Sequence, residues 1–288
     1  MYKILKKKVL TKDVKLFGIE ASHITFNAKA GNFVVVIVDE KGERIPLTIY
    51  DWDKEKGIVY IIFQEIGTST KKLGMLEEGD EVFAIAGPFG KHFESKKYGN
   101  IVMIGGGVGV PAIFPIAREL RKQENKIISI TGFRNKDLII LKDEMESVSD
   151  NLIIATNDGS YGIKGLVTDA MQDLINKGDK IDLVIAIGPV IMMKAVSELT
   201  KKYGIKTIVS LNALMLDATG MCGICRVNVG GQVKFSCVDG PDFDGHLVDF
   251  DQLMSRLAAY KEEEKISLDH FCNLNSGIEK SIKGNKNG

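Results

Sequence analysis

The sequence predicts a small antiparallel β-barrel, then a doubly wound α/β domain, then a short cysteine-rich lobe. In the first hundred residues, short runs rich in Val, Ile, Tyr and Phe are separated by turn residues. From about Gly99 onward, apolar runs alternate with segments of helical periodicity, which is typical of a parallel sheet covered by helices. Three of the four cysteines and six glycines then fall within residues 212–245. We therefore expect three successive structural parts.

The barrel is expected over residues 1–97. Its strands are predicted by their composition and by turn residues between them, such as Lys41-Gly42 and Lys56-Gly57. We expect these strands at Tyr2–Leu10, Phe33–Val38, Arg44–Tyr50, Ile58–Glu65 and Glu81–Ala86. No long helix is predicted among them, and such closely spaced strands favour an antiparallel barrel.

The α/β domain is expected over residues 98–211. Its strands are predicted at Ile101–Ile104, Ile127–Thr131, Leu152–Ala155, Leu183–Ile187 and Lys206–Leu211. The helices between them are predicted at Pro111–Gln123, Lys136–Ser147, Val167–Asn176 and Ile191–Tyr203. The strands are continuous Val and Ile runs, as in a parallel sheet that is buried on both faces.

Regular periodicity ends after residue 211. Residues 212–250 are predicted to form a loop-rich cofactor lobe, and residues 251–288 a C-terminal helix and tail. The helix is expected at Asp249–Lys265, and Lys280–Gly288 is expected to be disordered.

The composition is that of an ordinary soluble globular protein, with 44% hydrophobic and 26% charged residues. The 38 Lys and Arg residues equal the 38 Asp and Glu residues, which argues against nucleic acid as a partner. The apolar stretch Ile101–Ala117 contains four glycines and two prolines and is too short to span a bilayer, so no membrane association is expected. Met1–Leu16 lacks the apolar core of a secretory signal. Clustered cysteines indicate a metal site in a reducing compartment, so we expect a cytoplasmic protein.

The strongest motif is the run from Asp217 to Cys225, because it has the spacing of an iron–sulfur site. Cys222 and Cys225 are separated by two residues, and Cys237 follows after eleven more. Plant-type [2Fe–2S] proteins use C-x₄-C-x₂-C and a distant fourth cysteine, and Asp217 occupies the first position of that spacing. A carboxylate can donate an anionic oxygen to iron, and this harder ligand is expected to alter the redox potential. The predicted metal ligands are Asp217, Cys222, Cys225 and Cys237.

Three other interpretations of these cysteines stay open. The three clustered cysteines and His246 could hold a structural zinc ion, although their spacing is not that of a zinc knuckle. Cys272 could replace Asp217 as the fourth ligand of an iron–sulfur cluster. Each cysteine could also be an inert buried thiol, which three cysteines at this spacing make a weak interpretation.

Two glycine-containing motifs follow strands of the predicted parallel sheet and indicate a nucleotide site. The first contains Gly106, Gly107 and Gly109 and leads into a helix, whose N-terminus can bind a pyrophosphate. The second contains Gly188, Pro189 and Met192 at the end of a later strand. Asp158 ends the third strand at the same edge and either caps a turn or contacts the ligand. Either glycine motif alone could be a simple strand-to-helix turn.

The predicted barrel contains two motifs suited to a flavin diphosphate. The first is Arg44-Ile-Pro46-Leu47-Thr48, and the second is Gly67-Thr68-Ser69-Thr70. An arginine together with hydroxyl and glycine N–H donors can bind a diphosphate. Taken singly, each motif is also compatible with a solvated charge or a turn.

Together these motifs resemble the ferredoxin–NADP reductase superfamily, in which a flavin-binding barrel precedes a nicotinamide-binding domain. The cluster lobe narrows the resemblance to the electron-transfer subunits of dihydroorotate dehydrogenase. It is similar above all to the related small subunits of NADH-dependent reduced ferredoxin:NADP oxidoreductase. Asp217 and the extension beyond residue 250 favour the latter, because the dihydroorotate subunit is shorter and has Cys in that position.

The superfamily motifs match this chain unevenly. The R-x-Y-[ST] flavin motif falls on Ile45–Thr48, so that Leu47 replaces the aromatic residue against the flavin and the arginine lies one position early, at Arg44. The V-G-x-G-T motif becomes Ile66–Thr70, and C-G-P-x-x-M becomes Ile187–Met192. The missing cysteine implies that positioning of the hydride, not thiol chemistry, matters here.

The resemblance implies FAD, NAD(H) and a [2Fe–2S] cluster as cofactors. Hydride passes between NAD(H) and FAD, and single electrons pass between FAD and the cluster, so no catalytic side chain is expected. The implied partner is a larger subunit with flavin and [4Fe–4S] clusters. It binds NADPH and bifurcates electrons, with ferredoxin reached through the complex.

Two rival functions remain at this stage. The first is the electron-transfer subunit of an NAD-dependent dihydroorotate dehydrogenase. The second is a non-enzymatic, zinc-stabilised nucleotide-binding module. The choice between NAD and NADP is weakly encoded, because Arg134 and Lys136 follow the second predicted strand and could meet a 2′-phosphate.

Overall fold

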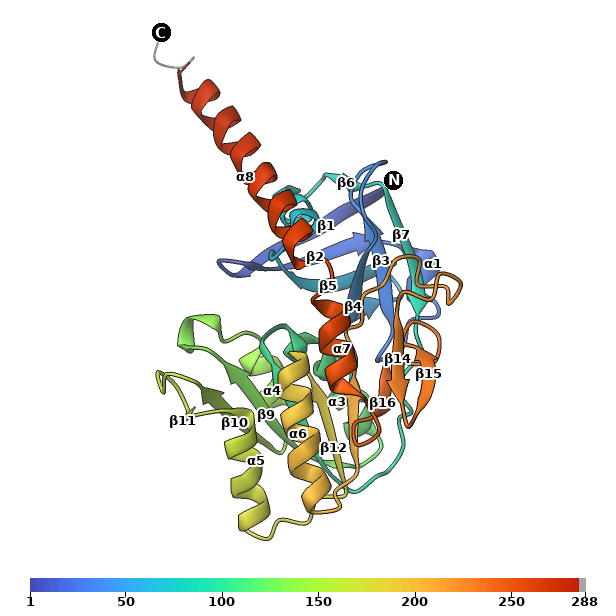
Figure 1. Cartoon of the computed structure of the whole chain (residues 1–288), viewed down its shortest axis with the longest axis vertical. Coiled ribbons are helices and arrows are strands. Elements are labelled where there is room, and N and C mark those ends of the chain that lie inside the picture. The colour runs from blue at the N-terminus through green and yellow to red at the C-terminus, as the bar shows by residue number, and fades with distance from the viewer. Residues whose placement is uncertain (285–288) are drawn as a thin grey trace.

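The computed structural model describes residues 1–284, with side chains described as far as Leu274. Figure 1 shows a β-sheet half-barrel at one end, an α/β domain at the other, and the cysteine-containing lobe beside their junction. The last helix, α8 (Lys261–Gly284), runs past the half-barrel. Within residues 1–284, no helix combines the length and apolar character needed to cross a bilayer.

The N-terminal sheet is an antiparallel half-barrel of seven strands in the order β6-β1-β2-β5-β4-β3-β7. Its strands are β1 (Tyr2–Thr11), β2 (Val14–Glu20), β3 (Phe33–Ile37), β4 (Ile45–Asp53), β5 (Ile58–Gln64), β6 (Glu81–Val82) and β7 (Ala84–Phe89). Helices α1 (Ser22–Thr25) and α2 (Thr68–Met75) belong to the same part. Phe17 and Phe63 meet edge to face at 5.1 Å between ring centroids, in a core that also buries Leu73. The predicted antiparallel barrel is confirmed as a half-barrel.

Three elements of this part, β2, α1 and α2, were not predicted. Strand β2 follows β1 after the turn Lys12-Asp13, which carries neither of the usual hairpin signals, Gly or Asn. Helix α2 was missed because its eight residues include Gly74, a poor helix former. The last predicted strand, Glu81–Ala86, is divided into β6 and β7.

The second sheet confirms the predicted doubly wound fold. Its order is β11-β10-β9-β8-β12-β13-β16, and all neighbouring strands are parallel except β13 and β16. The strands are β8 (Asn100–Gly106), β9 (Lys126–Phe133), β10 (Asn151–Thr156), β11 (Ile163–Lys164), β12 (Leu183–Ile187), β13 (Thr207–Ser210) and β16 (Asp242–Asp244). Helices α3 (Val110–Lys122) and α4 (Lys142–Val148) pack in one core cluster, and α5 (Val167–Asn176) and α6 (Val190–Lys202) in another.

One predicted helix of this domain is wrong. Lys136–Ser147 contains a short 3₁₀ turn at Lys136–Leu138 and then α4, instead of one continuous helix. Between them Leu141 takes a left-handed conformation with φ 55°. Ile140 and Leu141 are buried in the domain core, so their packing interrupts the helix that their local sequence favours.

The predicted helix Asp249–Lys265 is also interrupted. It is observed as α7 (Phe250–Leu257), with Asp249 as its N-cap, followed after a break by α8. Residues 280–284 belong to α8, so the expected disorder is wrong there, and residues 285–288 lie outside the described part. The lobe between the α/β domain and α7 contains one hairpin, β14 (Arg226–Val229) and β15 (Gln232–Phe235).

Arg118 of α3 links the half-barrel to the α/β domain. Its guanidinium lies 2.8 Å from the Asp51 carboxylate of β4 and over the rings of Trp52, at 5.4 Å, and Phe114, at 5.5 Å. Tyr50 of β4 stacks on Phe114, with 5.3 Å between ring centroids. One side chain of the α/β domain therefore makes both an ion pair and a cation–π contact to the same barrel strand.

We expect Arg118→Gln to destabilise the protein by about 1–2 kcal/mol, because it removes a half-buried ion pair together with cation–π contacts. The matched control is Arg121→Gln, on the same helix, which removes a more exposed ion pair to Asp150. That control should cost less than about 1 kcal/mol. Urea denaturation of both variants tests this expectation, and equal losses would show that the aromatic contacts of Arg118 add nothing.

Candidate cofactor sites

The two glycine motifs of the nucleotide domain meet at the carboxyl edge of the parallel sheet. A Cβ atom on Gly109 would lie 2.1 Å from the carbonyl oxygen of Ile187. A Cβ atom on Gly106 would lie 2.5 Å from the sulfur of Met192 and 3.0 Å from Cδ of Pro189. The loops after β8 and β12 therefore approach so closely that only hydrogen fits at Gly109, while a side chain at Gly106 would have to displace Met192.

Gly107 differs from the glycines on either side of it. Its φ is +52°, and a Cβ atom there would meet no other atom within 4 Å. Among the glycines of this loop, Gly107 therefore borders open space, shortly before the start of α3. Backbone N–H groups at such a helix start can bind a phosphate anion, so the residues present fit a dinucleotide.

Asp158 lies at the same edge, at the end of β10, and caps a turn. Its carboxylate accepts hydrogen bonds from the backbone N–H of Ser160, at 2.9 Å, and from the Ser160 hydroxyl, at 2.6 Å. These bonds, together with the charge of Lys136, lower the pKa of Asp158. The backbone N–H of Lys136 donates to the Ser160 hydroxyl at 2.8 Å, which ties the loop after β9 to the loop after β10. Asp158 is exposed and anionic at the edge where a nucleotide would bind.

The flavin motif lies on β4 and just before it. Leu47 is half-buried and packs against the barrel core, while Thr48 follows on the alternate side of the strand. Arg44 is exposed immediately before β4. The hydroxyl of Ser69 donates to the carboxylate of Glu43, so the residue beside Arg44 lies at the first turn of α2. The structure thus brings the two barrel motifs together, whereas contact of Leu47 with a flavin stays a prediction.

Helix α2 starts at the second of these motifs. Gly67 is its N-cap, and the hydroxyl of Thr70 accepts from the Gly67 N–H at 3.1 Å. The hydroxyl of Thr68 lies 3.0 Å from that of Ser267 on α8. The first N–H groups of a helix have no partner inside the helix, so this turn suits a flavin diphosphate.

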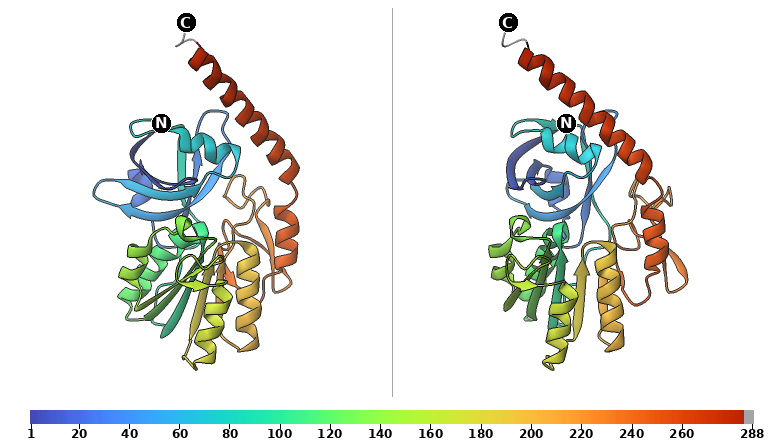
Figure 2. Two further views of the ribbon diagram at one scale, coloured as in Figure 1. Left: turned by 90° about the vertical axis from the view of Figure 1, so that its left-hand side faces the viewer. Right: turned by 60° about the vertical axis from the view of Figure 1, so that its left-hand side comes forward.

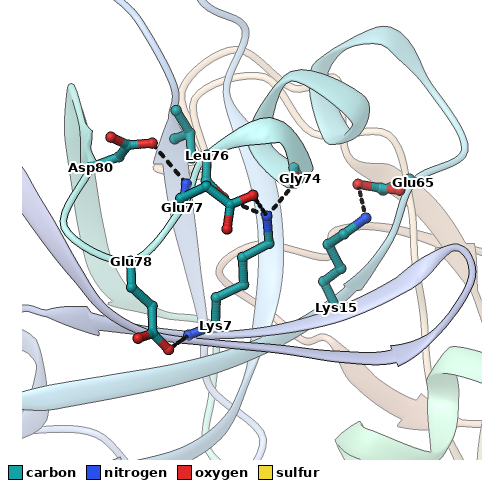
Figure 3. Close-up of polar contacts among 8 residues, drawn as sticks. All are labelled: Lys7, Lys15, Glu65, Gly74, Leu76, Glu77, Glu78 and Asp80. Atoms are coloured by element: carbon teal, nitrogen blue, oxygen red, sulfur yellow. Dashed lines mark hydrogen bonds and ion pairs between the residues drawn. The ribbon is translucent and has the colours of Figure 1, made fainter.

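A polar cluster around Lys7 holds the other end of α2, as Figure 3 shows. The ammonium of Lys7 donates to the carbonyl oxygens of Gly74, at 3.1 Å, and Leu76, at 2.8 Å, and pairs with Glu77 at 2.6 Å. A lysine at a helix C-terminus is favourable because it meets unpaired carbonyl groups. Sequence reasoning missed this role of Lys7, because the lysine-rich β1 resembles a solvated strand.

Lys15 and Glu65 form a second ion pair beneath the same helix, with both side chains largely buried. A Cβ atom on Gly74 would lie 1.6 Å from the carboxylate oxygen of Glu65. Glu65 directly precedes the Ile66-Gly67 turn, so this pair positions the start of α2. Glycine is unfavourable inside a helix, but the missing side chain of Gly74 lets α2 approach Glu65.

The four predicted metal ligands lie in the lobe as two pairs. The sulfur atoms of Cys225 and Cys237 are 3.1 Å apart, and the sulfur of Cys222 lies 3.3 Å from a carboxylate oxygen of Asp217. A hydrogen bond from the N–H of Thr219, then one from Cys222, lowers the pKa of Asp217, so its carboxylate is anionic. In a [2Fe–2S] cluster held by four protein ligands, each of the two irons takes two of them, and two donor pairs fit that pattern.

Burial also affects the ionisation of Cys237 in the inner pair. Burial, followed by a hydrogen bond with Cys225, raises the pKa of the Cys237 thiol to about 12. Both cysteines are only 2% exposed. Thiolates in such a place need a positive ion beside them, which an iron centre supplies.

Of the two alternative ligands, His246 contacts another residue and Cys272 lies on another element. The His246 ring lies 3.0 Å from the hydroxyl of Thr200 on α6. Cys272 is exposed on α8, which Figure 2 shows running along the half-barrel and away from the lobe. In the described part of the chain, no three His, Cys, Asp or Glu side chains converge on a single ion site. The two-pair arrangement favours the predicted set over a zinc site and over Cys272.

Family models match two of the three parts. Residues 103–198 match the oxidoreductase NAD-binding domain, which covers the glycine motifs and Asp158. Residues 212–249 match the iron–sulfur cluster binding domain of dihydroorotate dehydrogenase B, which covers Asp217 and the three clustered cysteines.

Whole-chain relatives are also found. The chain is 45% identical over 268 residues to a Thermotoga maritima homologue of the dihydroorotate dehydrogenase B (NAD⁺) electron transfer subunit, covering 93% of this chain and 94% of the relative. It is 48% identical over 272 residues to an uncharacterised Clostridium beijerinckii protein, covering 92% of each.

Among solved structures, that of the NADH-dependent reduced ferredoxin–NADP oxidoreductase matches with a TM-score of 0.89 and 44% identity. The match covers 94% of this chain and 98% of that one. A ferredoxin reductase of carbazole 1,9a-dioxygenase, at 17% identity and a TM-score of 0.62, shares the fold.

We expect Gly107→Asn to weaken NADH binding at least tenfold without loss of stability. Asn tolerates the left-handed conformation, so the new side chain enters the open space beside the loop. The matched control is Gly204→Asn, at another left-handed glycine with no atom within 4 Å of its Cβ position, at the end of α6. Titration calorimetry with NADH, together with thermal unfolding, measures both effects. Unchanged affinity in Gly107→Asn would place the nucleotide elsewhere.

We expect Asp217→Ala to lose most of the bound cluster, while Cys272→Ala retains it. Asp217→Cys should keep the cluster but change its potential and paramagnetic spectrum, because sulfur is a softer donor than oxygen. Iron and sulfide content and electron paramagnetic resonance measure these outcomes. Loss of the cluster in Cys272→Ala, with an unchanged spectrum in Asp217→Ala, would show that the ligand set is wrong.

Proposed function

The chain belongs to the family of dihydroorotate dehydrogenase B electron-transfer subunits and their homologues, and we propose that it serves an electron-bifurcating NADH-dependent ferredoxin:NADP oxidoreductase. Asp217 carries this proposal, because it stands beside Cys222 where a cluster ligand is needed. The likeness to the solved oxidoreductase over nearly the whole of both chains supports it.

The cofactors that this function requires are NAD(H), FAD and a [2Fe–2S] cluster. When bound, they supply the hydride exchange and the one-electron steps. The chain's own residues bind and orient them. Gly106, Gly107 and Gly109 hold the nicotinamide nucleotide, and Gly67–Thr70 with Arg44 hold the flavin diphosphate.

The relative position of the two nucleotides depends on the contact between half-barrel and α/β domain. Hydride transfer needs the two reacting carbon or nitrogen atoms to be about 3–3.5 Å apart. Arg118 and Phe114 fix α3 to β4, and α3 begins at the glycine loop proposed to hold the nicotinamide nucleotide. The same helix therefore sets the nucleotide loop against the strand that carries Thr48.

The chain acts with a partner subunit, since its homologues are electron-transfer subunits of larger enzymes. We propose that this partner carries flavin and [4Fe–4S] clusters, binds NADPH and passes electrons to ferredoxin. Cys222 is exposed, so the cluster site reaches the surface where such a subunit can bind.

The second candidate is the electron-transfer subunit of an NAD-dependent dihydroorotate dehydrogenase. The family model of the lobe and the Thermotoga maritima relative favour it. The two functions differ in the partner and its substrate. Co-purification of the native complex decides between them, because only the partner of the second candidate interconverts dihydroorotate and orotate.

We expect acid treatment of the purified chain to release FAD, and NADH to reduce that FAD faster than NADPH does. The exposed anion of Asp158 at the nucleotide edge disfavours a 2′-phosphate, which carries negative charge. Mass spectrometry identifies the flavin, and stopped-flow bleaching at 450 nm compares the two nucleotides at about equal concentrations.

FMN, or no flavin in folded protein, would contradict the assignment of the half-barrel. Faster reduction by NADPH would instead identify Arg134 and Lys136 as a phosphate site. A colourless protein that contains zinc would contradict the function as a whole and favour a nucleotide-binding module.

A further inference from the structure

Asp242 is a buried carboxyl group at the junction of all three parts, and no step described above uses it. It begins β16, the antiparallel edge strand, where it pairs in register with Ser210 of β13. Ser210 is the last residue of its strand, so Asp242 lies at the carboxyl edge of the sheet, toward the half-barrel. Gly31 of the half-barrel lies beside it, since a Cβ atom there would be 3.5 Å from Oδ2 of Asp242.

Few contacts offset the cost of burying the Asp242 carboxyl group. Its Oδ2 atom is inaccessible to solvent and has no hydrogen-bond partner among the described residues, although part of the residue reaches the surface. The hydroxyl of Ser210 is the one hydrogen-bond donor that affects its ionisation. A buried carboxylate without a cation is costly, so such a group is easily protonated. Burial raises the pKa of Asp242 to about 7, against the smaller opposing effect of Ser210.

No charged neighbour sets this ionisation. Titratable side chains on the segments beside Asp242 are Lys29, near Gly31, then Lys91 and His92, near Phe93 of the half-barrel, and Asp239 and Asp244 on its own segment. None of them contributes to the pKa of Asp242. The Asp239 carboxylate accepts from the N–H of Phe235 at 2.7 Å, and Asp244 accepts from the N–H of His246 at 2.9 Å.

Short backbone links join Asp242 to the cluster lobe. The carbonyl of Pro241 accepts from the N–H of Leu211 at 2.9 Å, and the carbonyl of Gly240 accepts from Lys91 at 2.6 Å. The hydroxyl of Ser236, next to Cys237, donates to the carbonyl of Leu211 at 3.4 Å. The segment that carries Asp242 is therefore hydrogen-bonded to the half-barrel side through Lys91, and through Leu211 to Ser236, the residue next to Cys237. Charge is weakly screened in such a buried region.

We propose that Asp242 is a redox-linked proton acceptor, which takes up one proton when one electron from the reduced flavin enters the cluster of the adjoining lobe. The Asp242 carboxylate would take one proton from solvent and become neutral, which would offset the one negative charge that reduction adds to a bound cluster, so the net charge of this region would stay constant. An O–H bond forms, and no other bond forms or breaks. When the electron leaves for the partner subunit, the proton leaves Asp242. This inference rests on the proposed function, because NADH and FAD supply the electron.

The test is a redox titration of the cluster in the holoprotein, followed by electron paramagnetic resonance between pH 5.5 and 8.5. A tenfold change in proton concentration corresponds to about 59 mV for one electron. We expect the potential of the unaltered protein to fall as pH rises through neutrality, with a slope up to that value. In Asp242→Asn the potential should be independent of pH, because amide and protonated acid have similar shape but the amide cannot ionise.

Two further variants make the result specific. Asp244→Asn, two residues along the same strand at an exposed carboxylate, should leave the slope unchanged. Ser210→Ala removes the donor to the carboxylate and should move the sloping region to higher pH, even where Asp242→Asn does not fold. A flat potential in the unaltered protein, or a slope that persists in Asp242→Asn, would overturn the proposal. Absence of any cluster signal would instead overturn the proposed function, and this inference with it.

Discussion

The close approach of Gly109 to the carbonyl of Ile187 is the constraint on which the rest of the site depends. At 2.1 Å from a Cβ position, this contact admits no side chain, so the loops after β8 and β12 form a single surface. Helix α3 starts directly from that surface and carries Phe114 and Arg118 to the half-barrel. A shift of the glycine loop would thus move α3, and with α3 the strand that carries the flavin motif.

The half-barrel holds the short helix α2 in place by contacts on either side of the helix. Helix α2 has only eight residues, and an isolated helix of that length is not stable in water. Lys7 binds its C-terminal carbonyl groups, and the buried pair Lys15–Glu65 fixes the chain before its first turn. Because both anchors are internal, the N–H groups of the first turn stay available for an anion.

Sequence reasoning predicted correctly those elements that depend on a local pattern of residues. Both helix and strand were correct at Val167–Asn176 and Leu183–Ile187, where apolar periodicity is unbroken. It failed where distant residues decide, as at Leu141, whose burial interrupts a helix, and at Gly74, whose missing side chain admits Glu65. The candidate site motifs could be proposed from the sequence because their spacing is local. The pairing of Lys7 with α2, more than sixty residues away, and the isolation of Asp242 depend on packing and leave no local signal.

In the cluster lobe, burial separates the four proposed ligands into an inner and an outer pair. Cys225 and Cys237 are buried in the core of the lobe, whereas Cys222 is exposed and Asp217 is half-buried beside it. A thiolate that faces water is open to oxidation, while a carboxylate is not. An aspartate at the outer pair therefore leaves one oxidisable outer ligand instead of two, and its lowered pKa keeps it anionic without the metal. The inner pair needs no such protection, because the surrounding core covers both sulfur atoms. Burial raises the pKa of the Cys237 thiol, so a thiolate at that position would need the positive charge of a metal beside it.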